Sequence, residues 1–505
     1  MKPYQILAFF FSIVLVLLML SLVFPKDGIR INNNLKIRFF NIQELFRDDS
    51  IQYADISGIM QSVSASDETR TEIPASSNYE TVTEIPVSDL VNIPDSLPLY
   101  DTLRANADSL KSIVRHIEFP NGKRKLFHPF FEKASSLKAS RELLRILHYG
   151  DSQIETDRIT SYLRNRMQLA FGGSGCGLVP AIPLYNGKMS ISQDYSANWQ
   201  RFTGFAGIDT SLGHRRFGAL FSFASMRHSR NSKLESGWIE LRPSPIAYAT
   251  AKSFNQLSLF MGNEGPSPVA MKLYVNDSLV NEKLVENSFT YQKFKWNLGD
   301  TPEKLKLEFN PESKLSLYGV SLDNSWGIAI DNIPLRGSSG LDFSKTDTVI
   351  LKKMYKDLNV GMLILQFGGN VVPYLESVSA YKRYFMRELA VLKRLLPGVP
   401  VLVVGPSDMS VKEKGRYMTY PNLEKVRDAL RRAALDSGCS FWDMYEAMGG
   451  RNSMPSWVFA EPPLAVNDFV HFNIRGSRII AEMLYNSIIY EYNVWENGEE
   501  LGRKQ

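Results

Sequence analysis

The sequence predicts an α/β fold with a doubly wound sheet, interrupted by an all-β jelly-roll or sandwich insertion. Strand-like and helix-like patterns alternate before about residue 182 and again after residue 326, as they do around a parallel sheet. Between these parts helical periodicity disappears, and short alternating or aromatic-rich segments recur between Asn, Gly and Pro residues. In both α/β parts, buried strands end in polar residues, at the position where open α/β sheets bind ligands. We therefore expect one α/β domain, split by the insertion, to carry the functional site.

The N-terminal end of the chain contains an uncharged apolar run at residues 6–24, ILAFFFSIVLVLLMLSLVF. A helix of about 19 residues spans roughly 29 Å, close to the thickness of the hydrocarbon layer of a bilayer. A cleaved signal peptide is the alternative, but it would need a shorter apolar core and small residues before the cut. We therefore expect residues 1–25 to form an uncleaved transmembrane anchor, with the α/β domain and its functional site outside the cytoplasm, in the periplasm.

The segment after this run is predicted to be a tether. From about residue 48 it is rich in Ser, Thr, Glu, Asp and Pro, and it cannot bury enough apolar surface to offset the entropy of ordering. The expected organisation is a juxtamembrane segment and disordered linker at 26–98, a helical lead-in with the first part of the α/β domain at 99–182, the β insertion at 183–325, the second α/β part at 326–492, and a tail at 493–505.

The composition excludes several classes of protein. A net charge of +5 spread over 505 residues gives no case for nucleic-acid binding. The two cysteines, Cys176 and Cys439, supply neither a disulfide framework nor a metal cluster. We expect each to be a small buried apolar residue.

The α/β parts are predicted from buried strands and amphipathic helices. The first strand covers residues 143–149, and a helical pattern with one mostly apolar side covers 154–171. Near-continuous apolar runs, typical of a parallel sheet buried on both faces, predict the later strands. These strands lie at 327–334, 361–367, 399–405 and 439–443, with helices at 381–396, 423–435 and 479–488.

The insertion is predicted from segments that alternate between apolar and polar residues. The clearest are 237–242, 256–261, 271–275, 289–296 and 304–309. The region also holds Trp199, Trp238 and Trp296 and a basic aromatic stretch at 214–217, residue types that a sugar-binding face would use. The alternative, that these are ordinary core or surface residues, stays open.

Polar residues at three strand ends could form one catalytic site. The first strand stops at Gly150-Asp151-Ser152, which alone would be an ordinary capped turn. Asp468 and His471 lie three residues apart, so the carboxylate can fix the imidazole while the other ring nitrogen faces a serine. The side-chain amide of Asn370 and the backbone N–H groups of Gly340 and Ser152 can stabilise an oxyanion.

Taken together, Gly150-Asp151-Ser152, Gly340, Gly368-Gly369-Asn370 and Asp468-x-x-His471 resemble, in order, the four sequence blocks of the SGNH/GDSL hydrolases. The resemblance covers residues from about 143 to 190 and 326 to 490. It implies a flavodoxin-like sheet order, with Ser152 as nucleophile, His471 as base and Asp468 as its orienting carboxylate. It also implies an oxyanion hole of Ser152, Gly340 and Asn370, and no metal or cofactor.

The chain also resembles the peptidoglycan O-acetylesterases of this superfamily, in which a carbohydrate-binding-module-like jelly roll interrupts the hydrolase domain. The segments 317–322 and 448–454 are similar to that subgroup. The resemblance implies that the substrate is an acetylated cell-envelope polysaccharide. Two positions depart from the pattern or leave it ambiguous: Val371 stands where the family usually has Asp, and Gly337 is an alternative to Gly340.

Two other functions stay open. An O-acetyltransferase would use the same triad with a sugar hydroxyl as acceptor, and a membrane-bound acyltransferase partner would supply its acetyl groups. A non-catalytic envelope protein would use the insertion to bind glycan. The filled triad and oxyanion positions disfavour this last alternative.

Overall fold

The computed structural model describes residues 3–23, 29–30, 36–37, 51–60, 114–185, 190–205, 207, 212–227, 236–288, 290–310 and 314–503. The chain forms two compact units, residues 1–52 and 53–505. The first contains helix α1 (Pro3–Val23) and a short antiparallel pair, β1 (Ile29–Arg30) and β2 (Lys36–Ile37). Within the described part of the chain, no helix is long and apolar enough to cross a membrane. The structure therefore does not support the anchor predicted at residues 1–25, and most of the predicted linker at 26–98 lies outside the described residues.

The second unit is built around a five-stranded parallel sheet with the order β15-β3-β16-β17-β20. In order along the chain, its strands are β3 (Leu143–Gly150), β15 (Gly327–Pro334), β16 (Val360–Gln366), β17 (Val401–Val404) and β20 (Ser440–Trp442). The second strand therefore lies beside the first on one side, and the third lies on the other. This is the flavodoxin-like order, and it confirms the predicted doubly wound sheet.

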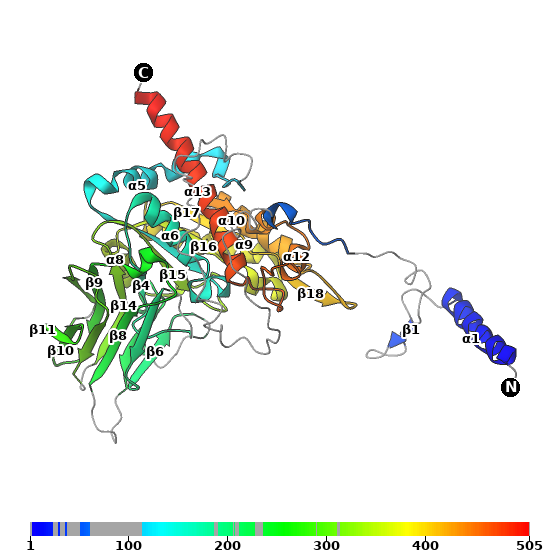
Figure 1. Cartoon of the computed structure of the whole chain (residues 1–505), viewed down its shortest axis with the longest axis horizontal. Helices are drawn as coiled ribbons and strands as arrows, with labels where there is room; N and C mark the ends of the chain where they lie inside the picture. Colours follow the sequence, from blue (N-terminus) through cyan, green and yellow to red (C-terminus); the bar gives the residue numbers. More distant parts are fainter. Residues whose placement is uncertain are drawn as a thin grey trace. The chain divides into compact units, whose positions relative to one another are not determined.

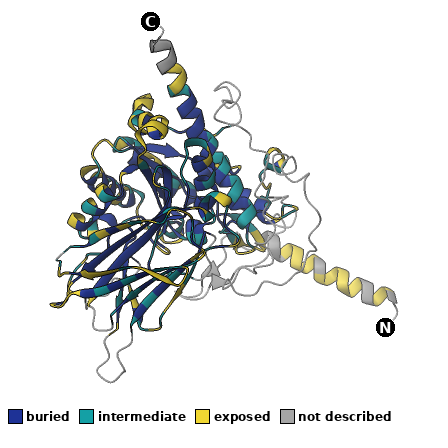
Figure 2. Cartoon of the chain, turned by 60° about the vertical axis from the view of Figure 1, so that its left-hand side comes forward, coloured by how far each residue is buried: buried dark blue, intermediate teal, exposed yellow. Residues whose placement is uncertain are grey.

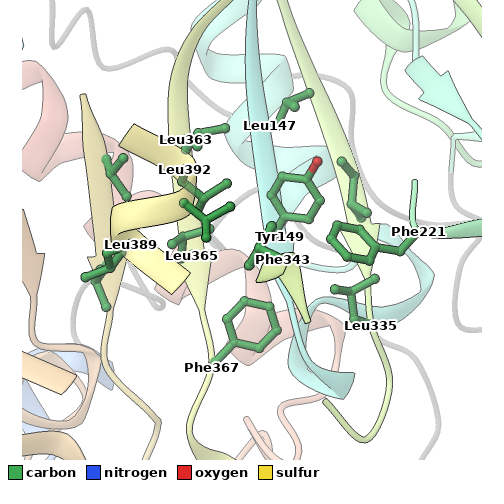
Figure 3. Packing of buried hydrophobic residues seen from close by; sticks show 14 of the residues in the cluster. Leu147, Tyr149, Phe221, Leu335, Phe343, Leu363, Leu365, Phe367, Leu389 and Leu392 are labelled. Carbon is green, nitrogen blue, oxygen red and sulfur yellow. The ribbon is translucent and has the colours of Figure 1, made fainter. Parts of the chain in front are cut away.

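Helices cover both faces of this sheet (Figure 1). One face packs against α5 (His128–Ser140), α6 (Thr160–Phe171) and α13 (Ile474–Arg503). The other packs against α8 (Thr348–Asp357), α9 (Val378–Leu395) and α10 (Leu423–Asp436). Neighbouring strand residues alternate between the faces: Ile146 joins the first core and Leu147 the second. Figure 3 shows the second core, in which Leu147 and Tyr149 of β3 share one cluster with Leu389 and Leu392 of α9.

The insertion is a β-sandwich of two antiparallel sheets that share one apolar core. The outer sheet has the order β11-β10-β13-β8-β5, and the inner sheet has the order β12-β9-β14-β7-β6, with β4 paired to β14. The strands are β4 (Gly177–Val179), β5 (Ile191–Tyr195), β6 (Trp199–Thr203), β7 (Ser222–Met226), β8 (Gly237–Pro243), β9 (Gln256–Asn263), β10 (Val269–Val275), β11 (Ser278–Val285), β12 (Gln292–Asn297), β13 (Leu305–Phe309) and β14 (Leu315–Asp323).

Several short elements complete the second unit. They are the hairpin β18 (Ser410–Glu413) and β19 (Arg416–Thr419), and the helices α7 (Ala249–Lys252), α11 (Met444–Ala447) and α12 (Ser453–Val458). The 3-10 turns are η2 (Pro120–Gly122), η3 (Arg124–Phe127), η4 (Ser152–Asp157), η6 (Phe343–Lys345) and η7 (Gly369–Tyr374).

Two ends of the α/β domain differ from expectation. Helix α13 continues to Arg503 through the predicted tail, because Tyr492 and Trp495 pack their rings against Phe131 of α5; Figure 2 shows the buried part of this helix. In the predicted helical lead-in, Glu118 instead forms an antiparallel bridge with Phe441 of β20. The part of that lead-in before residue 114 lies outside the described residues.

Candidate active site

Three adjacent strands of the parallel sheet, β15, β3 and β16, end level with one another. Gly150 pairs with Pro334 of β15 on one side and with Gln366 of β16 on the other. A Cβ atom at Gly150 would lie 3.0 Å from the Gln366 carbonyl oxygen, so only glycine fits without displacement. The segments after these strands, which carry Ser152, Gly340 and Asn370, therefore leave the sheet at one edge, where the strand order reverses.

Ser152 begins the turn η4 directly after β3. The Asp151 side chain caps this turn, because its Oδ1 accepts the N–H of Gln153 at 3.0 Å. The Asp151 N–H donates to the Gln366 carbonyl at 3.1 Å, which extends the sheet pairing up to the nucleophile candidate. Ser152 is thus fixed at the sheet edge by backbone contacts on both sides.

Ser152, His471 and Asp468 form one hydrogen-bonded chain. The Ser152 Oγ and His471 Nε2 atoms lie 2.8 Å apart, and His471 Nδ1 lies 2.7 Å from Asp468 Oδ2. The other carboxylate oxygen, Asp468 Oδ1, accepts the backbone N–H groups of Val470 and His471, both at 2.9 Å. One oxygen of Asp468 therefore shapes the loop while the other holds the imidazole.

The two carboxylates beside the serine have opposite electrostatic environments. Burial alone raises the pKa of Asp468, but the hydrogen bonds from the ring and backbone of His471 outweigh it, and this pKa lies below its ordinary value. Burial raises the pKa of Asp151 to about 6, although the N–H of Gln153 and a charged His471 act to lower it. Asp468 is therefore the carboxylate that stays ionised next to the imidazole.

Gln153 is a site residue that the sequence analysis missed. Its Nε2 donates to the Val470 carbonyl at 2.5 Å and to Ser407 Oγ at 2.9 Å. Gln153, the residue after the serine, is thus tied to Val470, the residue before the histidine, across 317 positions of the chain. Proximity to Ser152 was the only sequence signal, because a sequence does not show where a side chain points.

The two other predicted oxyanion residues lie on adjoining loops and meet at Ser338. Asn370 Nδ2 donates to the Ser338 carbonyl at 3.1 Å, and the Gly340 N–H donates to Ser338 Oγ at 2.9 Å. Gly340 has φ +78°, and a Cβ atom there would lie 2.9 Å from the Phe367 ring, so the position requires glycine. These hydrogen bonds order the two loops but run to Ser338 rather than to the serine–histidine pair. Val371, where the family usually has Asp, donates its N–H to the Gly368 carbonyl at 2.9 Å.

Backbone strain lies on both sides of this site. Thr156 and Asp157 of η4 have φ of +61° and +69°, and Phe469, between Asp468 and Val470, has φ +57°. Bulky residues rarely adopt this conformation, and it persists where surrounding packing enforces it. For Phe469 that packing is a stack against Tyr417, with ring centroids 3.5 Å apart.

Within the described ranges, no group of three or more His, Cys, Asp and Glu side chains could hold a metal ion. Cys176 and Cys439 are both buried, as predicted.

Known proteins resemble this chain in fold rather than in sequence. No protein-family model and no curated protein matches the chain. A solved structure of a peptidoglycan O-acetylesterase is similar over 75% of this chain and 97% of its own, with 22% identity and a TM-score of 0.56. A family two carbohydrate esterase from Clostridium thermocellum, in complex with cellohexaose, matches 57% of this chain and 98% of its own at 10% identity and a TM-score of 0.23. An acetyl xylan esterase matches 32% of this chain and 81% of its own at 14% identity and a TM-score of 0.26.

The first of these likenesses shows that the chain has the fold of that esterase structure. The four short sequence blocks led to the prediction of this fold, and the likeness confirms the fold alone. The other two likenesses are too distant to support an argument.

Proposed function

We propose that this protein is a serine esterase that removes O-acetyl groups from a cell-envelope polysaccharide, peptidoglycan or a related glycan. The observation that carries the proposal is the hydrogen-bonded chain from Ser152 Oγ through His471 to Asp468 at the sheet edge. The fold shared with a peptidoglycan O-acetylesterase supports the choice of substrate class. Because such polymers lie outside the cytoplasm, the proposed site of action is extracytoplasmic.

In the proposed mechanism, His471 Nε2 takes the proton of Ser152 as its oxygen attacks the acetyl carbonyl carbon. The tetrahedral intermediate then expels the sugar oxygen, which receives that proton from His471 and leaves as a hydroxyl. A water molecule, deprotonated by His471, then attacks the acetyl-serine. The bond from the acetyl carbon to Ser152 Oγ breaks, the serine oxygen takes the proton from His471, and acetate leaves. Asp468 holds the imidazole orientation and stabilises the imidazolium in both steps.

Three groups are proposed as oxyanion donors: the Ser152 N–H, the second hydrogen of Asn370 Nδ2, and the Gly340 N–H. Asn370 is anchored through its first hydrogen on the Ser338 carbonyl, which leaves the second for substrate. For the Gly340 N–H to take part, it must exchange Ser338 Oγ for the oxyanion; Ser338 Oγ keeps Asp342 as a partner. In measured cases, one such donor lowers the activation barrier by about 3 to 4 kcal/mol.

The transferase alternative uses the same residues and differs in the acceptor. The side chains of His471 and Asp468 are 27% and 30% exposed, so water can reach the base directly. This exposure favours water as acceptor over a sugar hydroxyl delivered in concert with a membrane-bound acyltransferase partner. Acetate release that rises only when a glycan acceptor is added would favour the transferase instead.

The experiment that tests the proposal is acetate release from O-acetylated peptidoglycan and acetylated xylan by the full chain. The Ser152→Ala variant should lose at least about 10³-fold in rate, because the nucleophile is gone while the fold remains. Ser135→Ala, an exposed serine of α5, is the matched control and should keep the parent rate. A Ser152→Ala variant as active as the parent would overturn the proposal.

A further inference from the structure

A row of aromatic rings runs outward from the loop that holds the triad. We name Tyr53, Phe459, Phe469 and Tyr417 the aromatic ledge. Phe469, which follows Asp468, stacks on Tyr417 at 3.5 Å and meets Phe459 edge-on at 5.5 Å. Phe459 in turn meets Tyr53 at 6.1 Å between ring centroids. The ledge is therefore continuous with the proposed catalytic site through a single peptide bond.

The outer rings of the ledge are open to solvent. Phe459 is 57% exposed and Tyr53 is 37% exposed, whereas Phe469 beneath them is 6% exposed. A phenylalanine left half in water forgoes much of the free energy that its burial would supply. Adjacent exposed aromatic side chains on a soluble surface are typical of a binding site.

Two separate structures hold this surface in place. Tyr53 comes from the segment 53–60, which lies beside α12 (Figure 1); Ser456 Oγ donates to the Ala54 carbonyl at 2.7 Å across 402 positions of the chain. Ile56 of this segment is buried.

On the other side, the buried Asp408 fixes the hairpin that carries Tyr417. It accepts Thr419 Oγ1 at 2.7 Å and the Met454 N–H at 2.8 Å. An ordered aromatic surface loses little conformational entropy when it binds, so both supports favour a binding role over incidental exposure.

We propose that the aromatic ledge binds sugar rings of the glycan whose acetyl group enters the triad. A pyranose ring has apolar C–H faces and a rim of hydroxyl groups, so it can pack on an aromatic face while its hydroxyls stay hydrated. The ledge adjoins His471 and Asp468, so a polymer bound there passes the serine. This inference rests on the proposed esterase function and places the glycan contact on the α/β domain rather than on the β-sandwich.

The first test compares a polymer with a small ester. In the full chain, Tyr53→Ala and Phe459→Ala should each lower the ratio of kcat/KM on O-acetylated peptidoglycan to kcat/KM on p-nitrophenyl acetate by about 5- to 10-fold, mainly through a higher KM. Tyr53→Phe keeps the ring and should retain the parent ratio. Tyr384→Ala, a 50% exposed tyrosine of α9 outside the ledge, is the matched control and should also retain it.

The second test measures binding without turnover. Chitohexaose should bind the Ser152→Ala chain in calorimetric titration, and adding Tyr53→Ala should raise its Kd about tenfold. Unchanged ratios and unchanged Kd values in folded variants, with Ser152-dependent acetate release intact, would overturn the ledge and leave the esterase standing. Ledge-dependent chitohexaose binding without any Ser152-dependent acetate release would overturn the esterase and leave a sugar-binding surface. Ledge variants that change only self-association of the chain would also overturn the sugar assignment.

Discussion

The parallel sheet of the α/β domain and the central strands of the inner sheet of the β-sandwich are both buried on two faces, yet only the parallel sheet leads into the proposed active site. Every residue of β16, β9 and β14 is buried. In the parallel sheet all strands point the same way, so the polar residues that follow them gather at one edge. In the antiparallel inner sheet neighbouring strands end at opposite edges, and no such convergence arises.

The inner sheet uses its second buried face for attachment. Leu259 points into the sandwich core, whereas its neighbour Phe260 joins the core of the α/β domain. Phe221 of the insertion likewise meets Tyr149 of β3, as Figure 3 shows. By contrast, β10 and β13 of the outer sheet alternate between buried and half-buried residues, as expected for a sheet with one face toward solvent. The insertion is therefore packed onto the α/β domain.

The largest effect should come from the edge of the parallel sheet. Asp468→Asn removes the carboxylate that orients and stabilises the His471 ring, so kcat for acetate release should fall about 10⁴-fold. The thermal midpoint of unfolding should change by only a few degrees, because the amide can still accept the Val470 and His471 N–H groups. Steady-state kinetics and a melting curve on the same sample measure both. Activity within tenfold of the parent would show that Asp468 is not part of the machinery.

A smaller effect, on stability alone, should come from the inner sheet. Phe260→Ala leaves a cavity between the insertion and the α/β domain and should lower the free energy of unfolding by about 3 to 5 kcal/mol in urea titration. Lys272→Ala, on β10 of the outer sheet with a 37% exposed side chain, is the control and should change it by less than about 0.5 kcal/mol. If the two variants were equally stable, the inner sheet would not join the two parts.

The third prediction concerns the buried carboxyl group of Asp151. The pKa of Asp151 is raised by burial to about 6 in the folded state, against about 3.9 in an unfolded chain. The folded state therefore holds this proton more tightly, so the stability it contributes is present at pH 4 and is lost as the pH rises through 6.

Asp151→Asn cannot titrate. The free energy of unfolding of the parent minus that of this variant should therefore fall by about 2 kcal/mol between pH 4 and pH 7. Urea unfolding at several pH values measures the difference, with Ser135→Ala as a variant whose difference stays flat. If this difference in free energy rose with pH, the pKa of Asp151 would be lowered in the folded state rather than raised.

Much of the fold was predictable because its signals are local. Near-continuous apolar runs marked β15, β16 and β17, and alternation marked β8, β10 and β13. The predicted helix at 154–171 is in fact the turn η4 followed by α6, since Glu155, Thr156 and Asp157 leave helical geometry after the capped serine. That difference arises from tertiary packing around the site, which overrides local helical preference.

The sequence by itself determined the elements, the split α/β domain and the order Ser152, Asp468, His471, because residue type and spacing encode these locally. Only the tertiary structure decided that Gln153 reaches the Val470 carbonyl, that Ser338 joins the Gly340 and Asn370 loops, and that Tyr53 meets Phe459. Each of these contacts joins loops or strands far apart in the chain. These contacts form only when all the elements between them are packed, so no local sequence pattern predicts them.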